Sequence, residues 1–258
     1  KTLKIDDMRS INGKLLVAIL QDQTSAEDFS RQLTVAPELY VNCDAGNFVF
    51  MLLETMLQQG DKENLQEFLF HNIRKTYSAC PKCNYSGEMA AQSSTFMLNI
   101  LSTQKDATLE QQVLANLNTS EVCPQCHGAQ CDVVVSFETL PRFLFLSTKD
   151  YYSTSQLAPT LCIPNAPSGE RHFYDLIGCN TVTANPSHQA VTRIAPGKWS
   201  LSVEDDVCDL PSWEHASKRM TFGKATLFAF ERYDIRRDRS LAKSSSTTDA
   251  LSASSSSS

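Results

Sequence analysis

The sequence predicts an α+β domain, and three observations carry this prediction. Apolar residues recur at helical spacing from Asp44 onward. Two Cys-x-x-Cys turns follow the helix, and a series of short apolar strands comes after them. These strand candidates cover residues 133–137, 143–146, 173–179, 189–194, 199–203 and 225–231. Strands in succession downstream of a helical half are typical of the α+β class.

The length, charge and cysteine content of the chain exclude some classes of protein and favour others. A chain of 258 residues can bury a sizeable core, and its net charge of -6 argues against nucleic acid as the main partner. No apolar run reaches the roughly 20 residues that a membrane helix needs. Nine cysteines without a signal peptide favour an intracellular location, in the cytoplasm or nucleus. The chain begins at Lys1 rather than methionine, so we expect it to be a fragment of a longer protein.

In the N-terminal half, the apolar run 15–20 fits either a buried strand or a helical turn. The next segment is predicted to be a core-facing helix, which Asn42 or Asp44 caps and Gly60 ends. Its apolar positions are Ala45, Phe48, Val49, Leu52 and Met56. Residues 65–79 are predicted to be extended and to lead into the first Cys-x-x-Cys turn.

Further along, residues 95–101 form a strand candidate, and Leu109, Val113, Leu114 and Leu117 predict a short amphipathic helix. In the strand at 173–179, alternation places Tyr174, Leu176 and Gly178 on one face. The serine-rich segment 240–258 cannot bury a core and is predicted to be disordered.

The cysteine turns are Cys80-Pro-Lys-Cys83 and Cys123-Pro-Gln-Cys126, with 39 residues between them. Each turn directs two thiolates to one point, and four thiolates make a closed tetrahedral zinc site. Zinc suits such ligands because it binds thiolates tightly and has no redox chemistry. His127 and Cys131 lie beside the second turn and could replace a ligand, but we treat them as bystanders. The zinc is therefore predicted to be structural.

The sequence offers fewer candidates for catalytic residues than for metal ligands. His188 stands at the start of one predicted strand, and Asp205-Asp206 follows the strand that begins at Trp199. A carboxylate on a neighbouring strand could orient the imidazole so that it acts as a base. A histidine in a loop is, however, more often a solvent-exposed surface residue without a catalytic role. Cys43 precedes the Asp44 helix, a place that can lower a thiol pKa, but a structural thiol fits it as well.

Taken together, these segments resemble the ubiquitin-specific protease family of cysteine deubiquitinases over about residues 40–233. Cys43-Asp-Ala-Gly-Asn-Phe48 is similar to the family's Gln-Asp-Ala-His-Glu-Phe box, and the two cysteine turns resemble its zinc-binding fingers. Leu140-Pro-Arg-Phe-Leu-Phe-Leu146 looks like its Leu-Pro-x-x-Leu strand. Tyr174-Asp-Leu-Ile-Gly178 and Ala225-Thr-Leu-Phe-Ala-Phe-Glu-Arg232 resemble the strand that enters the histidine box and the closing strand.

The resemblance implies the papain-like cysteine protease superfamily and an architecture of fingers, palm and thumb. Residues 1–239 would be a partial domain with fingers at about 66–138 and a palm at about 139–233. The implied partner is ubiquitin or a ubiquitinated protein, and the implied state is a monomer. The fingers would hold ubiquitin and lead its C-terminal tail into a cleft.

The resemblance also implies residue roles. His188 occupies the place of the catalytic histidine, although Ser187 and Gln189 replace the usual glycine and aromatic neighbours. The family's orienting Asp or Asn stands four residues after a tryptophan, which here is Val203. Asp205, or alternatively Asp206, can fill this role only with a small insertion.

The catalytic nucleophile is the one part of the family's active site that remains to be located in this sequence. In the family it lies in an Asn-Thr-Cys box upstream of the Asp44 helix, and this sequence has no such box. We therefore expect thiol-dependent hydrolysis of the isopeptide bond at the ubiquitin C-terminus with a nucleophile from outside this chain, which would be inactive alone. The alternatives are an inactive ubiquitin-binding scaffold of the same fold, or a protease for a ubiquitin-like modifier such as SUMO.

Overall fold

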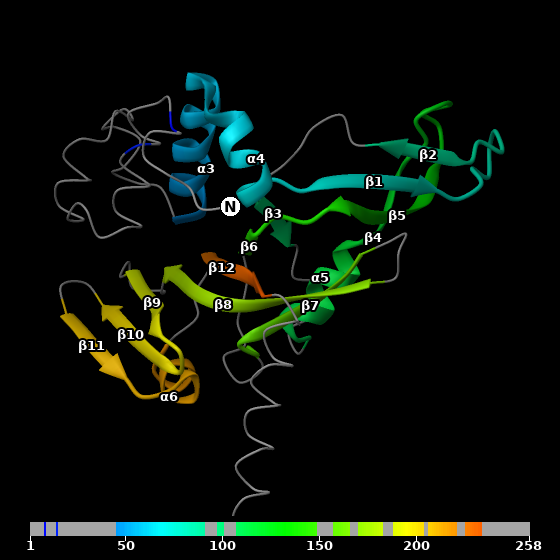
Figure 1. The fold of residues 1–258 in the computed structure, drawn as a ribbon. Helices are drawn as coiled ribbons and strands as arrows, with labels where there is room; N and C mark the ends of the chain where they lie inside the picture. The colour runs from blue at the N-terminus through cyan, green and yellow to red at the C-terminus, as the bar shows by residue number, and fades with distance from the viewer. Residues whose placement is uncertain are drawn as a thin grey trace, which may run out of the picture.

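The computed structural model describes residues 8, 14, 45–90, 97–100, 107–148, 157–165, 170–182, 188–203, 206–220 and 225–233. The predictions for residues 15–20, Cys43 and the serine-rich segment 240–258 lie outside these residues. The described part is an α+β fold with two helices first, a projecting four-stranded sheet next and a larger sheet below them (Figure 1). The predicted fold class is confirmed.

Two helices form the thumb. Helix α3 spans Ala45–Met56, as predicted, and packs its apolar side chains into a buried cluster. A short turn, η3 at Leu57–Asp61, follows α3 and contains a kink at Gly60, whose φ of 97° is left-handed, so Gly60 ends the first helix as predicted. A second helix, α4, follows at Lys62–Leu69, so the prediction of extended chain from residue 65 is wrong for its first five residues. Leu65, Phe68 and Leu69 recur at helical spacing and are buried beside α3.

The four-stranded sheet forms the fingers. Its strands are antiparallel in the order β2-β1-β5-β4 and project away from the thumb (Figure 1). Their bounds are Asn72–Tyr77 for β1, Gly87–Ala90 for β2, Asn118–Val122 for β4 and Gln130–Thr139 for β5. The strand predicted at 133–137 is the centre of β5.

The palm is an eight-stranded sheet in the order β11-β10-β9-β8-β12-β6-β3, with β7 paired to the first half of β8. Its strands are β3 Met97–Ile100, β6 Phe143–Thr148, β7 Thr160–Asn165, β8 Glu170–Val182, β9 His188–Ala195, β10 Lys198–Val203, β11 Asp206–Leu210 and β12 Ala225–Tyr233. All strands predicted in this half are present. Strand β3 falls within the range expected for the fingers, but it pairs with β6 of the palm.

Helices cover both faces of the palm sheet. The thumb helices pack on one face, against Phe143, Phe145 and Leu227. On the other face lie α5 at Leu109–Asn116, which was predicted, and α6 at Trp213–Arg219, which was not. Because a sheet flanked on both sides needs apolar residues at successive positions, the continuous apolar run of β6 follows from this layering.

Strand β8 departs from simple alternation. Tyr174 and Leu176 are fully buried on the α5 face, as predicted, but the next core residue is Cys179 rather than Gly178. The pairing with β12 skips a residue between Leu176 and Gly178, which is a β-bulge. The bulge shifts the rest of the strand by one residue, so the predicted position of Gly178 on the core face is wrong.

Candidate functional site

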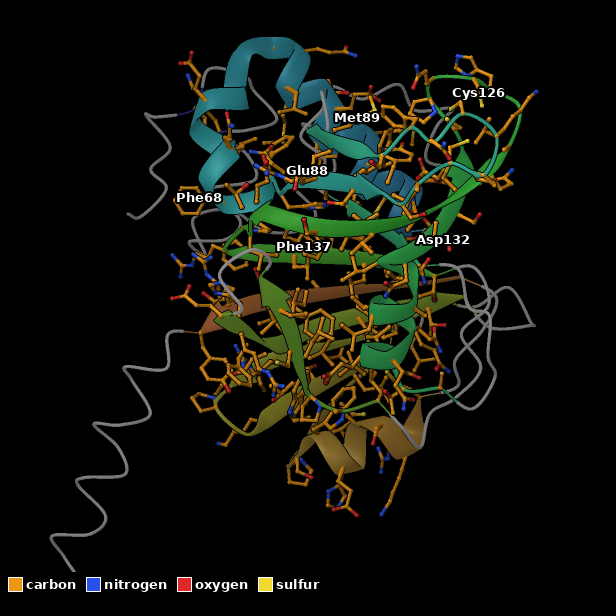
Figure 2. The ribbon with its side chains drawn as sticks, turned by 90° about the vertical axis from the view of Figure 1, so that its right-hand side faces the viewer. Phe68, Glu88, Met89, Cys126, Asp132 and Phe137 are labelled. Carbon is orange, nitrogen blue, oxygen red and sulfur yellow. The ribbon has the colours of Figure 1, made fainter. Side chains whose placement is uncertain are left out.

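The four predicted zinc ligands converge at the tip of the fingers. Cys80 and Cys83 follow β1, and Cys123 and Cys126 lie in the turn between β4 and β5. Their sulfurs all lie within 4.8 Å of one another. Figure 2 shows Cys126 at the end of the finger sheet, with Phe137 further along β5 towards the palm.

The spacing of the sulfurs fits a tetrahedral metal. A regular tetrahedron with Zn–S bonds of about 2.3 Å has edges of about 3.8 Å. The Cys80 and Cys126 sulfurs are 3.8 Å apart, and those of Cys83 and Cys123 are 3.7 Å apart. Four thiolates with this spacing could hold a metal ion and leave it no open position for substrate.

The two cysteine turns share one backbone design. In the first, the Asn84 N–H donates to the Cys80 carbonyl at 2.9 Å, and in the second the His127 N–H donates to the Cys123 carbonyl at 3.0 Å. Asn84 and His127 each adopt a left-handed conformation, with φ of 57° and 50°. Within each turn, backbone N–H groups also donate hydrogen bonds to the sulfur of the first cysteine.

These N–H groups favour the thiolate form. Burial opposes ionisation of the Cys80 thiol, but the backbone N–H groups of Lys82 and Cys83 donate hydrogen bonds to its sulfur and lower its pKa to about 6. The Lys82 nitrogen lies 3.4 Å from the Cys80 sulfur. Because a metal binds the thiolate, these N–H groups favour Cys80 as a ligand.

The two alternative ligands lie in different surroundings. His127 is exposed, and Cys131 is buried with 2% of its surface accessible. Cys131 belongs to the same buried cluster as Cys80 and Cys123. It lies outside the group of four sulfurs within mutual ligand distance.

The structure describes the backbone around the proposed catalytic histidine. His188 is the first residue of β9 and pairs with Val182 of β8. Strands β9 and β10 pair without interruption from Trp199 to Val203, and Val203 lies opposite Gln189. The side chain of His188 and the whole of Asp205 lie outside the described residues, so the dyad stays a prediction.

This pairing bears on the orienting carboxylate. Because Trp199 to Val203 carries no insertion, Val203 stands where the family resemblance would place the acid. Asp206 is exposed and begins β11, opposite Val203. Strand β11 is separated from β9 by β10, so the Asp206 backbone lies roughly 9–10 Å from β9, at about 4.8 Å per strand spacing.

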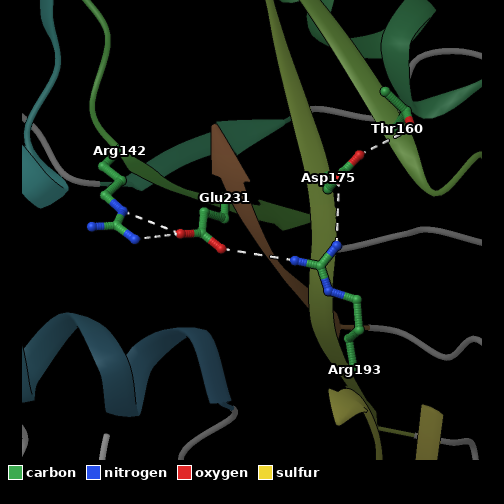
Figure 3. A network of polar contacts seen from close by, with 5 residues as sticks. All are labelled: Arg142, Thr160, Asp175, Arg193 and Glu231. Atoms are coloured by element: carbon green, nitrogen blue, oxygen red, sulfur yellow. Dashed lines mark hydrogen bonds and ion pairs between the residues drawn. The ribbon is translucent and has the colours of Figure 1, made fainter. Parts of the chain in front are cut away.

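A polar network that no sequence pattern indicated links several strands of the palm (Figure 3). Arg193 of β9 contacts Asp175 of β8 at 3.4 Å and Glu231 of β12 at 3.8 Å. Arg142 contacts Glu231 at 2.7 Å, and the Thr160 hydroxyl donates to Asp175 at 3.3 Å. The charges are partly exposed and add little stability, but they connect β9 to its neighbour β8 and to β12 beyond it.

Of three comparisons with known proteins, the one with solved structures finds matches. Neither a scan against protein-family models nor a search of curated protein sequences finds a match. The described arrangement is the fold of a deubiquitinase of the ubiquitin-specific protease type. Solved structures of the SAGA deubiquitinase (DUB) module that contains Ubp8 match nine-tenths of this chain.

The Ubp8–Sgf11–Sus1–Sgf73 module bound to monoubiquitin matches with a TM-score of 0.63 and 16% identity, over 90% of this chain and 60% of the matched chain. The yeast module with an Sgf73 variant matches with a TM-score of 0.62 and 17% identity, over 88% and 59%. This chain therefore spans about 60% of the length of the matched chains. The neighbours are multi-subunit complexes, so they lend no support to the predicted monomer.

Among the helices that the structure describes, none is long and apolar enough to cross a membrane.

Proposed function

We propose that this chain is the fingers, the palm and part of the thumb of a deubiquitinase domain, and that its partner is ubiquitin or a ubiquitinated protein. The observation that carries the proposal is the match to a DUB module, one structure of which holds monoubiquitin, together with four convergent thiols at the finger tip. A ubiquitin ligand agrees with an intracellular protein, cytoplasmic or nuclear.

The metal is proposed to be zinc with a structural role. Cys80, Cys83, Cys123 and Cys126 would hold it, and their sulfur spacing matches the edges of a ZnS₄ tetrahedron. A structural zinc supplies on the order of 10 kcal/mol to local folding. It would fix the end of the finger sheet, where the described core consists of a small cluster around Tyr77 and Val133. Metal analysis should give about one zinc per chain.

The proposed reaction is hydrolysis of the isopeptide bond at the C-terminus of ubiquitin. A cysteine from outside this chain would attack the carbonyl, His188 would take its proton and return it to the leaving amine, and water would release the acyl group. Ala190 shares a cross-strand row with Leu227, which packs against the thumb helices. Because residues two apart on a strand share a face, this row supports the proposal that position 188 is within reach of a thumb nucleophile.

A ubiquitin-binding scaffold without activity is the second candidate, and Val203 favours it. An aliphatic side chain at the position of the orienting acid cannot fix the tautomer of His188. In this reading the fingers and palm keep their ligand while the chemistry is lost. A ubiquitin-like modifier such as SUMO is the third possibility for the ligand.

The test separates these functions. A full-length protein that contains this chain is assayed for ubiquitin cleavage beside its His188→Ala variant, and Asp205→Asn is the second variant. An enzyme loses turnover by several orders of magnitude in His188→Ala while the fold is intact. Undiminished turnover removes His188 from the mechanism. If the parent binds ubiquitin but never cleaves it, the scaffold function holds. The 258-residue chain alone should form no adduct with a ubiquitin probe that carries a C-terminal electrophile.

A further inference from the structure

Strand β11 is one open edge of the palm sheet, and the proposed function gives it no role. Among the described strands it pairs with β10 alone, in a continuous antiparallel register from Asp206 to Leu210. It lies at the left margin of the palm in Figure 1. In such a pair, every second residue of the outer strand points its backbone N–H and C=O away from the sheet. These groups can pair with a further strand from another chain.

Strand β11 is anchored at one end and exposed along the rest. Leu210 is buried and belongs to the palm core, together with Ala216 of helix α6. The four residues before Leu210 are exposed, and Val207 has 67% of its surface accessible. Because the edge is already fixed in an extended conformation, a strand that binds to it has only its own ordering to offset.

The sequence of β11 lacks the usual protection of an open edge. Natural sheets protect their edges with proline, lysine or a bulge. Strand β7, whose described partner is β8, carries Pro164. Strand β11 contains neither proline nor lysine, and its pairing with β10 has no bulge. Its edge is therefore accessible to a partner strand.

The charge of β11 indicates which kind of strand fits. Asp206 and Asp209 are exposed, and neither forms an ion pair with a residue that the structure describes. Arg219 contacts the Cys208 sulfur at 3.6 Å, on the face of the strand opposite to Asp209. On its own face, Asp209 lies across from the uncharged Ser200. The strand thus presents two carboxylates, one on each face, and an exposed valine.

The edges of the finger sheet differ from β11 in charge. Glu88 of β2 forms an ion pair with Arg74 at 2.8 Å. Glu121 of β4 forms one with Lys75 at 2.7 Å. Their carboxylates are already paired, whereas those of β11 attract a cationic strand. Two copies of β11 side by side would place aspartates close together, and this repulsion disfavours a second copy as the occupant.

We propose that the open edge of β11 binds an extended, basic segment of a partner protein as an added strand. Lys or Arg side chains of that segment lie beside Asp206 and Asp209, and an apolar side chain contacts Val207. The main-chain hydrogen bonds supply affinity, and the alternating side chains supply specificity. This surface is separate from the cysteine turns, and the inference does not depend on ubiquitin or on the metal.

The experiment titrates the isotope-labelled 258-residue chain with a blocked peptide of the repeat Lys-Lys-Val and follows the backbone amide signals by NMR. This repeat places lysines on both faces of an extended strand, as β11 does its aspartates. We expect saturable shifts in β11 and slower hydrogen exchange of its outward amides. Asp206→Asn and Asp209→Asn should each weaken binding by about two- to fivefold. Asp132→Asn, an exposed aspartate in β5 of the fingers, is the matched control and should bind as the parent does.

Two control peptides separate strand pairing from charge. A Glu-Glu-Val repeat should not bind, and neither should a Lys-Lys-Val peptide with every backbone nitrogen methylated, because it keeps the charge but cannot donate hydrogen bonds. Equal binding of the methylated peptide, shifts outside β11, or unchanged affinity in both Asn variants would overturn the inference. A dimer whose β11 amides are protected without peptide would also overturn it, since the occupant would be a second copy. If Asp209→Asn does not fold, Asp206→Asn and the methylated peptide still decide.

Discussion

The hydroxyl of Tyr174 connects β8 to the turn before β6, and its removal should weaken the palm. Tyr174 has none of its surface exposed, and its hydroxyl donates to the Pro141 carbonyl at 2.7 Å. Tyr174→Phe keeps the ring but leaves a buried carbonyl without this donor, which costs about 1–3 kcal/mol. For a domain of this size, each kcal/mol lowers the melting temperature by about 2–4 °C.

Urea unfolding of Tyr174→Phe beside Tyr77→Phe measures this cost. Tyr77 is a matched tyrosine whose hydroxyl donates at 3.0 Å to Glu121, a carboxylate that is 34% exposed. Water can replace that donor, so Tyr77→Phe should cost less than about 1 kcal/mol. Equal losses in the two variants, or none in Tyr174→Phe, would refute the reasoning from burial.

Three other predictions follow from the same structure. His71 is buried with its ring edge against Phe137, and burial lowers its pKa from 6.5 to about 4. The fold therefore favours neutral His71, and about 3 kcal/mol of stability, present above pH 6.5, is lost as the pH falls towards 4. Unfolding free energies at pH 7 and pH 5 should differ less in His71→Phe than in the parent, and an unchanged difference would contradict this. His127→Gly should stabilise the finger by up to about 1 kcal/mol, because a histidine at φ 50° is strained, whereas Asn84→Gly should change it less because asparagine tolerates that conformation. Thermal unfolding of the metal-loaded protein measures both, and a destabilised His127→Gly would speak against strain. Removal of the metal by a chelator should speed proteolysis within residues 78–90 and 118–132 and leave the palm intact, and cleavage first in the palm would place the stabilisation elsewhere.

Secondary structure and the metal ligands could be predicted from the sequence where burial or ligation imposes a regular spacing of residues. Helix α3, the paired cysteine turns and all palm strands except β7 and β11 were predicted, because each shows a period or a spacing that few other structures share. Strands β2 and β4 were missed because both faces of the finger sheet carry polar residues, so no apolar alternation marks them. Helix α4 was missed because the chain from residue 65 was taken as extended, although Leu65, Phe68 and Leu69 recur at helical spacing after the kink at Gly60.

Relations between distant segments were beyond the sequence. The bulge in β8 depends on its partner β12, and a single strand gives no sign of it. Cys131 was treated as a bystander because its closeness to Cys80 depends on the register of β1 against β5. In the same way, only the β9–β10 register shows that Val203 lies opposite Gln189.

Calorimetric titration of the metal-loaded 258-residue chain with ubiquitin tests the central claim most directly. The account predicts saturable one-to-one binding, which weakens when Cys80→Ser removes a metal ligand and which SUMO does not reproduce. A matched Cys162→Ser variant, with a half-buried thiol in β7 of the palm, should bind as the parent does. A folded, metal-loaded chain that binds SUMO and not ubiquitin, or neither, would contradict the proposed function.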